Sequence, residues 1–143
     1  RPFRDGDPRA GAAEPAADHR IHFALNCGAK SCPPVKWFTA AALEEELRIV
    51  AMAWVEQDDN VLVDVPAKTL WLSAICQWYS SDFGANKQQV TTTLLAHARG
   101  EKKEQMQALL AGEFRLKYLK YDWSTNSSRS VKYSEVRMSC FLG

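Results

Sequence analysis

The residues with the most reactive side chains lie in one short stretch, residues 21–34, with the sequence IHFALNCGAKSCPP. Four residues separate Cys27 from Cys32, and His22 is the nearest imidazole along the chain. Such a pair can act as a thiol nucleophile with a helper, form a disulfide, supply half of a metal site, or pack as two reduced thiols. The sequence leaves these alternatives open and favours packed thiols or a disulfide over catalysis.

Catalysis by either thiol would require a stabilised thiolate, with a cation or a helix start nearby and an imidazole within reach. Lys30 and Lys36 flank the pair. His22 lies within a predicted strand over residues 21–25, whose apolar residues occupy the opposite face. Because no histidine has a spacing that directs it toward the pair, we expect ordinary reactivity of both thiols.

Three further polar residues could complete a catalytic site, and each also has a structural interpretation. His97 falls on the apolar face of a predicted helix, as a core or rim histidine would. Asp82 lies at a helix end and Asp122 in a turn, where carboxylates commonly bond nearby backbone, although either could orient a catalytic imidazole. The zinc-type spacings C-x2-C and H-x3–5-H do not occur, so no metal is expected, and no other cofactor is expected either.

The elements that must position these residues alternate between short strands and helices. Period-two alternation and helical spacing of apolar residues predict strands at 21–25, 61–65, 69–72, 114–118 and 131–142, and helices at 39–56, 74–83, 87–99 and through Met106 to Leu110. This order predicts an α+β fold, a small mixed or antiparallel sheet flanked by several helices. Cys76 and Cys140 fall in apolar patterns and are expected to be buried. The helix 74–83 is expected to pack against the helix 39–56 through Trp78, Tyr79 and Phe83.

Composition bounds the domain organisation and the class of partner. Residues 1–18 contain Phe3 as their only large apolar side chain, so we expect an extended arm or linker there and a single domain over 19–143. A formal net charge of +1 argues against nucleic acid, and no apolar run approaches the ~18 residues of a membrane span. Cysteine usage favours a soluble intracellular or organellar protein over a secreted one. Since the chain begins at Arg1 and not at Met, we expect its start to have been trimmed, processed or left out of this sequence, and any targeting peptide would have gone with it.

Three segments together resemble the domain-of-unknown-function 547 family, DUF547. They are HFALNCGAKSCPP at 22–34, LSAICQWYSSDFG at 72–84 and YDWSTN at 121–126, and the resemblance in order and spacing runs from about Asp18 to Asn126. Family members usually carry an upstream section with a motif of the type FWINxYN. That section is missing here, so the resemblance implies the C-terminal half of the family domain. Many plant members have Ser at the position of Cys32.

The family has no established activity to carry over to this chain. We expect a non-catalytic structural or protein-interaction module, a subunit of a larger assembly, with a protein partner and with the arm 1–18 as a candidate contact. The alternative is a thiol-dependent enzyme, either a cysteine hydrolase or a thiol–disulfide protein that uses Cys27 and Cys32. The substrate, the oligomeric state and the bridging of the two cysteines are left open.

Overall fold

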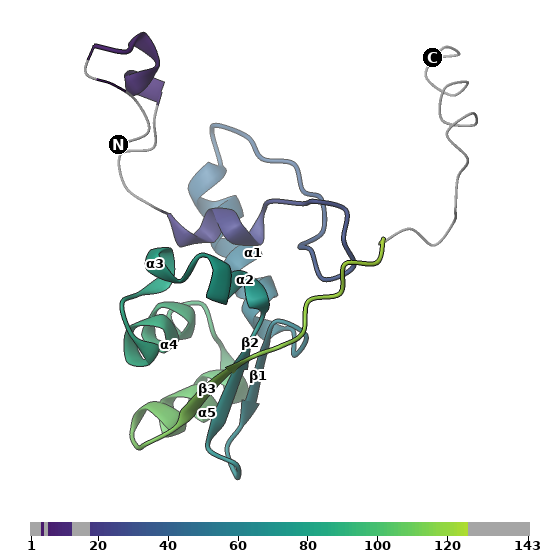
Figure 1. The fold of residues 1–143 in the computed structure, drawn as a ribbon, viewed down its shortest axis with the longest axis vertical. Helices are drawn as coiled ribbons and strands as arrows, with labels where there is room; N and C mark the ends of the chain where they lie inside the picture. Colours follow the sequence, from purple (N-terminus) through teal and green to yellow (C-terminus); the bar gives the residue numbers. More distant parts are fainter. Residues whose placement is uncertain (1–3, 5, 13–17, 126–143) are drawn as a thin grey trace.

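The fold is known from a computed structural model that describes residues 4, 6–12 and 18–125. The predicted strand 131–142 and Cys140 lie outside the described residues. Along the described chain the elements are η1 (Pro8–Ala12), η2 (His19–Phe23), α1 (Leu43–Glu56), β1 (Val61–Asp64), β2 (Thr69–Leu72), α2 (Ala74–Trp78), α3 (Ser80–Phe83), α4 (Lys87–Leu95), α5 (Gly100–Leu110) and β3 (Arg115–Tyr118), where η marks a 3-10 helix (Figure 1).

The described strands form one mixed sheet in the order β1-β2-β3. β1 and β2 are antiparallel neighbours that pair Val61 with Leu72, and the tight turn between them holds Lys68 at a positive φ of 49°. β3 pairs with β2 in parallel, with Leu70 opposite Leu116. Parallel neighbours need a long crossover, which α2 to α5 supply. The predicted α+β fold with a small mixed sheet is confirmed.

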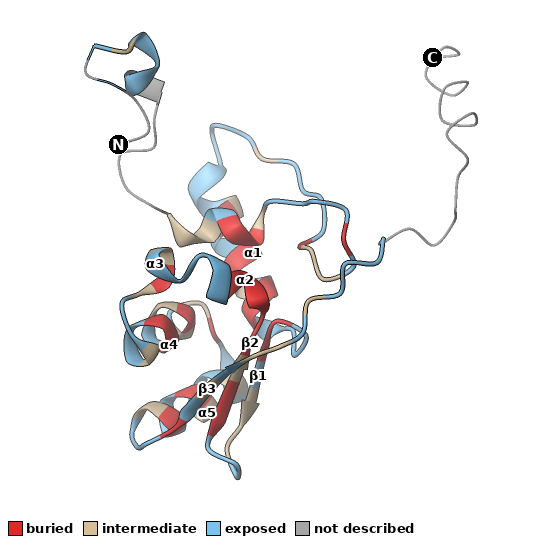
Figure 2. Cartoon of the chain, viewed as in Figure 1, coloured by how far each residue is buried: buried red, intermediate tan, exposed pale blue. Residues whose placement is uncertain are grey.

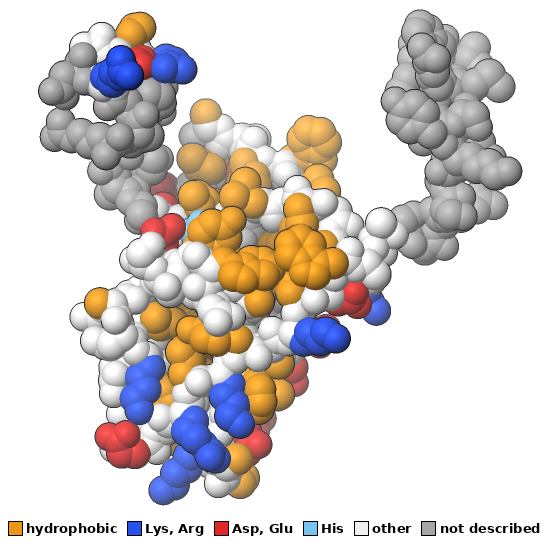
Figure 3. Space-filling model, viewed as in Figure 1, with side chains coloured by type: hydrophobic (Ala, Val, Ile, Leu, Met, Phe, Trp, Pro, Cys, Tyr) orange, Lys and Arg blue, Asp and Glu red, His pale blue; other side chains and the backbone are white. Residues whose placement is uncertain are grey.

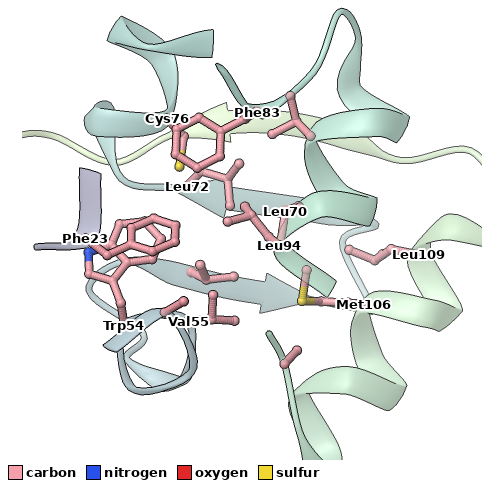
Figure 4. Packing of buried hydrophobic residues seen from close by; sticks show 14 of the residues in the cluster. Phe23, Trp54, Val55, Leu70, Leu72, Cys76, Phe83, Leu94, Met106 and Leu109 are labelled. Atoms are coloured by element: carbon pink, nitrogen blue, oxygen red, sulfur yellow. The ribbon is translucent and has the colours of Figure 1, made fainter. Parts of the chain in front are cut away.

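The core lies between β2 and the helices that cover the sheet. Leu70 and Leu72 are fully buried, and Phe23 from η2 stacks on Trp54 of α1 with ring centroids 4.2 Å apart. Buried positions concentrate on the inward sides of α1, α2 and β2 (Figure 2). Figure 4 shows side chains from η2, the helices and the sheet filling this space together: Phe23, Trp54, Val55, Leu70, Leu72, Cys76, Phe83, Leu94, Met106 and Leu109.

The prediction of a strand at 21–25 is wrong, because residues 19–23 form the 3-10 helix η2. Asp18 caps this helix by accepting a hydrogen bond from the backbone of Arg20. The burial explains the error. His22 and Phe23 are both buried although they are neighbours in sequence, whereas Ile21 is exposed. Neighbouring residues of a strand point to opposite faces, so only a helical turn brings this pair inside.

The burial predicted for the helix 74–83 is found for Phe83 and not for Trp78 and Tyr79, and its packing against the helix 39–56 stays a prediction. The helix is interrupted at Tyr79, so it divides into α2 and α3. Phe83 lies in the core, but Trp78 is 48 % exposed and Tyr79 45 % exposed. Both aromatic residues therefore lie partly at the surface, Trp78 as the last residue of α2 and Tyr79 between α2 and α3.

The structure bears on two further expectations, the absence of a membrane span and the arm over residues 1–18. No helix in the described part of the chain is long and apolar enough to cross a membrane. Within residues 1–18 the structure contains η1, where the Asp7 carboxylate pairs with the Arg9 guanidinium at 2.8 Å. The division of the chain into an arm and one domain stays a prediction.

Candidate functional site

The loop that carries the two cysteines is held in place by the chain after β3. Ala29 forms an isolated antiparallel bridge with Thr125, and the backbone N–H of Asp122 donates to the Ser31 hydroxyl over 2.9 Å. Gly28 has a φ of +83°, a backbone conformation that side chains with a Cβ rarely adopt. Figure 1 shows the segment after β3 running past α2 to this loop. Three segments distant in sequence therefore meet.

They meet around one pocket of about 280 Å³. Both candidate cysteines line it, together with aromatic residues from α2 and from the segment after β3. In Figure 3 hydrophobic side chains gather in this region of the surface, whereas Lys and Arg lie lower on the same face, over β3. The lining residues are His22, Leu25, Asn26, Cys27, Cys32, Ile75, Trp78, Tyr79, Tyr121 and Trp123. No Lys, Arg, Asp or Glu is among these described residues.

The Cys32 sulfur lies against the backbone of Cys27 within this pocket. The backbone N–H of Cys27 donates to the Cys32 sulfur over 2.9 Å, and the Cys32 thiol points to the carbonyl oxygen of Leu25 at 3.6 Å. Both cysteines are free, with Cys27 exposed and Cys32 half-buried. The Tyr121 hydroxyl lies 3.5 Å from the Cys27 sulfur. The pair is thus close enough to interact while Cys27 remains the more accessible thiol.

The surroundings of Cys27 favour its ionised form. Hydrogen bonds from the Tyr121 hydroxyl, from the backbone of Ala29 and from the Cys32 thiol lower the pKa of Cys27 to about 7. Burial, together with the neighbouring cysteine, raises the pKa of Tyr121, so the phenol keeps its proton as a donor. A thiol with this pKa is substantially thiolate at neutral pH, which differs from the ordinary reactivity expected from sequence.

His22 and Asp82 form a second polar unit at the same pocket. His22 is buried, its Nε2 lies 2.8 Å from an Asp82 carboxylate oxygen, and its ring stacks on Tyr79 with centroids 4.1 Å apart. This hydrogen bond lowers the pKa of Asp82, so the carboxylate accepts and Nε2 donates. His22 Nδ1 is buried without a hydrogen-bond partner among the described residues. No hydrogen bond joins His22 to either sulfur in the part of the chain described.

Asp82 and the other two sequence candidates, His97 and Asp122, are not among the described residues that line the pocket. His97 contacts His19, with the two Nε2 atoms 2.8 Å apart. Asp122 accepts hydrogen bonds from the backbone and the hydroxyl of Ser124 at 2.9 and 2.6 Å, as a turn residue does. Within the described residues no group of three or more His, Cys, Asp or Glu side chains is arranged to hold a metal ion.

Sequence reasoning missed the aromatic residues Trp78, Tyr121 and Trp123 as parts of the site. Trp78 was expected to pack against the helix 39–56. The available signal was the set of three segments that resemble one family. Each segment contributes to the pocket: 22–34 with the cysteines and His22, 72–84 with Trp78 and Tyr79, and 121–126 with Tyr121 and Trp123.

The α+β fold carries a surface pocket that Cys27 and Cys32 both line. The family described as "Protein of unknown function, DUF547" has a model that matches residues 1–55. This match confirms the resemblance to that family, and it includes His22, both cysteines of the pocket and the arm. The segments 72–84 and 121–126 lie beyond the matched residues, and correspondence to the C-terminal half of the family domain stays a prediction. No curated protein and no solved structure matches the chain.

Proposed function

We propose that this protein carries out thiol–disulfide exchange, with Cys27 as the attacking thiol and Cys32 as the resolving thiol. The observation that carries the proposal is the contact between the pair, with the Cys32 sulfur 2.9 Å from the backbone nitrogen of Cys27. The difference in exposure assigns the roles. An incoming disulfide reaches the exposed Cys27 first, and the half-buried Cys32 lies behind it.

The exchange consists of two balanced steps. The Cys27 thiolate attacks one sulfur of a substrate disulfide, forms a mixed disulfide and releases the other half as a thiolate. Cys32 then loses its proton and attacks the Cys27 sulfur, which closes the Cys27–Cys32 disulfide and releases the second substrate half as a thiolate. The substrate is reduced by two electrons and the protein pair is oxidised by two. The reverse sequence oxidises a substrate dithiol.

The contacts of the site support exchange over hydrolysis by a cysteine nucleophile. A cysteine hydrolase needs an imidazole that can take and return a proton at about 2.6–3.2 Å from the thiol. The hydrogen bonds of Cys27 come instead from Tyr121, Ala29 and Cys32, and they act by stabilising a thiolate. Exchange requires a thiolate and a partner thiol, and both are present.

A structural or protein-interaction module is the second candidate, and the exposed apolar surface favours it. Trp37 is 93 % exposed and Val35 71 % exposed on the chain that follows the cysteine loop. Exposed apolar residues grouped in this way are typical of protein contacts. Under this proposal the partner is a protein, and the arm 1–18 is a further candidate contact.

A redox titration of the full chain with Cys140→Ser tests exchange. The protein is equilibrated in buffers of defined potential, trapped with acid and alkylated, and the Cys27–Cys32 disulfide is quantified by mass spectrometry. We expect one two-electron transition between about −270 and −120 mV, the range of exchange proteins. Cys32→Ser should accumulate a mixed disulfide at Cys27. Cys76→Ser, the matched control, should leave the transition in place.

Two results would contradict the proposal. The pair could stay reduced across the whole range, which would leave the interaction module as the better account. Alternatively, a potential below about −300 mV would identify a structural disulfide that exchange does not use.

A further inference from the structure

The aromatic residues at the pocket form a cluster of their own beside the thiols. Trp78 and Trp123 have ring centroids 5.6 Å apart at an angle of 27°, and Tyr121 lies 4.8 Å from Trp78 and 4.6 Å from Trp123. Trp123 is 68 % exposed, so the cluster presents ring surface to solvent. Tyr121 belongs both to this cluster and, through its hydroxyl, to the Cys27 site. A group that reaches the Cys27 sulfur therefore lies next to these rings.

Apart from the Cys27 thiolate, the described lining of the pocket offers no full charge to pair with a charged substrate. Among the residues that the structure describes, its lining contains no Lys, Arg, Asp or Glu. The nearest lysine along the loop, Lys30, lies 3.8 Å from the Asp122 carboxylate, so its charge is partly compensated. Glutathione carries carboxylates on each half of its disulfide, and these need cations or backbone donors to replace their hydration. An uncharged apolar group has no such requirement.

The size of the pocket limits the group that it can hold. A volume of about 280 Å³ is just below the ~300–1,000 Å³ typical of sites for drug-sized ligands. This space accommodates one aromatic or large aliphatic side chain beside a disulfide. The rings of Trp78, Tyr121 and Trp123 would then stack on that side chain in the offset or edge-to-face arrangements that aromatic pairs prefer.

We propose that the disulfide exchanged by Cys27 belongs to a peptide with an aromatic or large apolar residue next to its cysteine, and that Trp78 and Trp123 select it. This inference rests on the proposed exchange activity and names its substrate class. Glutathione and other anionic disulfides are poor substrates under this proposal. The two tryptophans act on substrate binding and leave the Cys27 thiolate unchanged.

The test measures the second-order rate of the reduced protein with three matched peptide disulfides, the symmetrical dimers of acetyl-Trp-Cys-amide, acetyl-Glu-Cys-amide and acetyl-Lys-Cys-amide. Each rate is divided by that of N-acetylcysteine with the same peptide, which removes intrinsic differences in reactivity. We expect the Trp peptide to react about tenfold faster than the other two after this correction, the discrimination that one aromatic contact supplies. The Lys peptide separates an apolar preference from a preference for positive charge.

Variants of the pocket test whether Trp78 and Trp123 cause the preference for the Trp peptide. Trp123→Ala and Trp78→Ala should each reduce the ratio of Trp to Glu rates several-fold, while the pH dependence of Cys27 alkylation stays as in the wild type. Ile49→Ala, an exposed apolar residue on α1 outside the pocket lining, should leave the ratio unchanged. Equal corrected rates for the three peptides, with the Cys27–Cys32 disulfide still formed, would overturn the substrate class alone. Failure of every peptide to form that disulfide would overturn the exchange activity and this inference together.

Discussion

Cys76 and Cys27 show how two regions of this small protein treat the same side chain in opposite ways. Cys76 lies in the core, where burial raises the pKa of its thiol to about 12. Cys27 lies at the surface pocket, where hydrogen bonds from Tyr121, Ala29 and Cys32 lower the pKa of its thiol to about 7. Burial without a polar partner penalises the thiolate, and donors at an exposed site stabilise it. Reactivity therefore depends on location and not on residue type.

One helix separates the two regions. α2 is five residues long, and its buried residue Cys76 belongs to the core, whereas the buried Ile75 lines the pocket. Its last residue, Trp78, faces the pocket and is stacked on Trp123. The core thus fixes α2 firmly, and α2 in turn fixes one wall of the pocket. A site for exchange needs this combination of an accessible sulfur and rigid surroundings.

The largest expected difference between the regions is the rate of alkylation. At pH 7 the two pKa values imply a thiolate fraction about 10⁵ times larger for Cys27 than for Cys76. A thiolate of lower pKa is also a weaker nucleophile, which reduces the expected ratio of rates by roughly two orders of magnitude. We expect Cys27 to react with iodoacetamide at least about 10³ times faster than Cys76, since burial also blocks the reagent. Residue-by-residue mass spectrometry measures both rates. In guanidinium the rates should converge, and comparable rates in the native protein would break the comparison.

The next difference concerns stability. Phe23 is fully buried against Trp54, so Phe23→Ala should lower the free energy of unfolding by about 3–5 kcal/mol. Trp123 is mostly exposed, and Trp123→Ala should change it by no more than about 0.5–1 kcal/mol. Urea denaturation followed by circular dichroism measures both values. A large loss for Trp123→Ala would mean that the aromatic cluster is part of the folding core.

The core could largely be predicted from the sequence, because it depends on periodicity. The helical spacing of apolar residues at 39–56 predicted the buried face of α1, and alternation predicted β1, β2 and β3 closely. The errors fall where periodicity competes with local chemistry. Residues 19–23 form a 3-10 helix that Asp18 caps, and Trp78, the last residue of α2, is half-exposed.

The site could be predicted only in part, because its contacts cross large sequence separations. The loop with Cys27 and Cys32 was identified from its residue types and from the family resemblance. The donor that acts on Cys27, Tyr121, is 94 positions away, and Asp82 is 60 positions from His22. Spacing along the chain carries no information on such pairs. They are set by the sheet, since β3 sends residues 121–125 back past α2 to the cysteine loop.

A smaller effect is expected from Tyr121→Phe, which changes the pKa of the Cys27 thiol and leaves the shape of the pocket in place. Tyr121→Phe keeps the ring and removes the hydroxyl that is the largest cause of the low pKa of Cys27. We expect that pKa to rise toward the ordinary thiol value of ~8.5, which lowers the thiolate fraction at pH 7 by about tenfold. The pH dependence of Cys27 alkylation measures the shift. Tyr79→Phe, a tyrosine at the same pocket without a contact to the sulfur, is the matched control. An unchanged profile in Tyr121→Phe would assign the low pKa to the loop backbone and Cys32.

The smallest effect concerns histidines at the border of the core, where burial acts as it does on Cys76. His19 and His97 contact each other through Nε2 and lie against Phe23. Burial lowers the pKa of both rings below the usual ~6.5, so the unfolded chain binds more protons than the folded one in this range. The stability that results is fully present above pH ~6.5 and is lost as the pH falls through that value toward the lower pKa values of the folded state. The urea midpoint should therefore fall between pH 7.5 and pH 5, and it should fall further in the wild type than in His97→Gln. The variant keeps only the His19 ring and has no contact between two histidine rings. Equal differences in the two proteins would show that burial at this border does not discriminate against charge, and the comparison would then hold only for the cysteines.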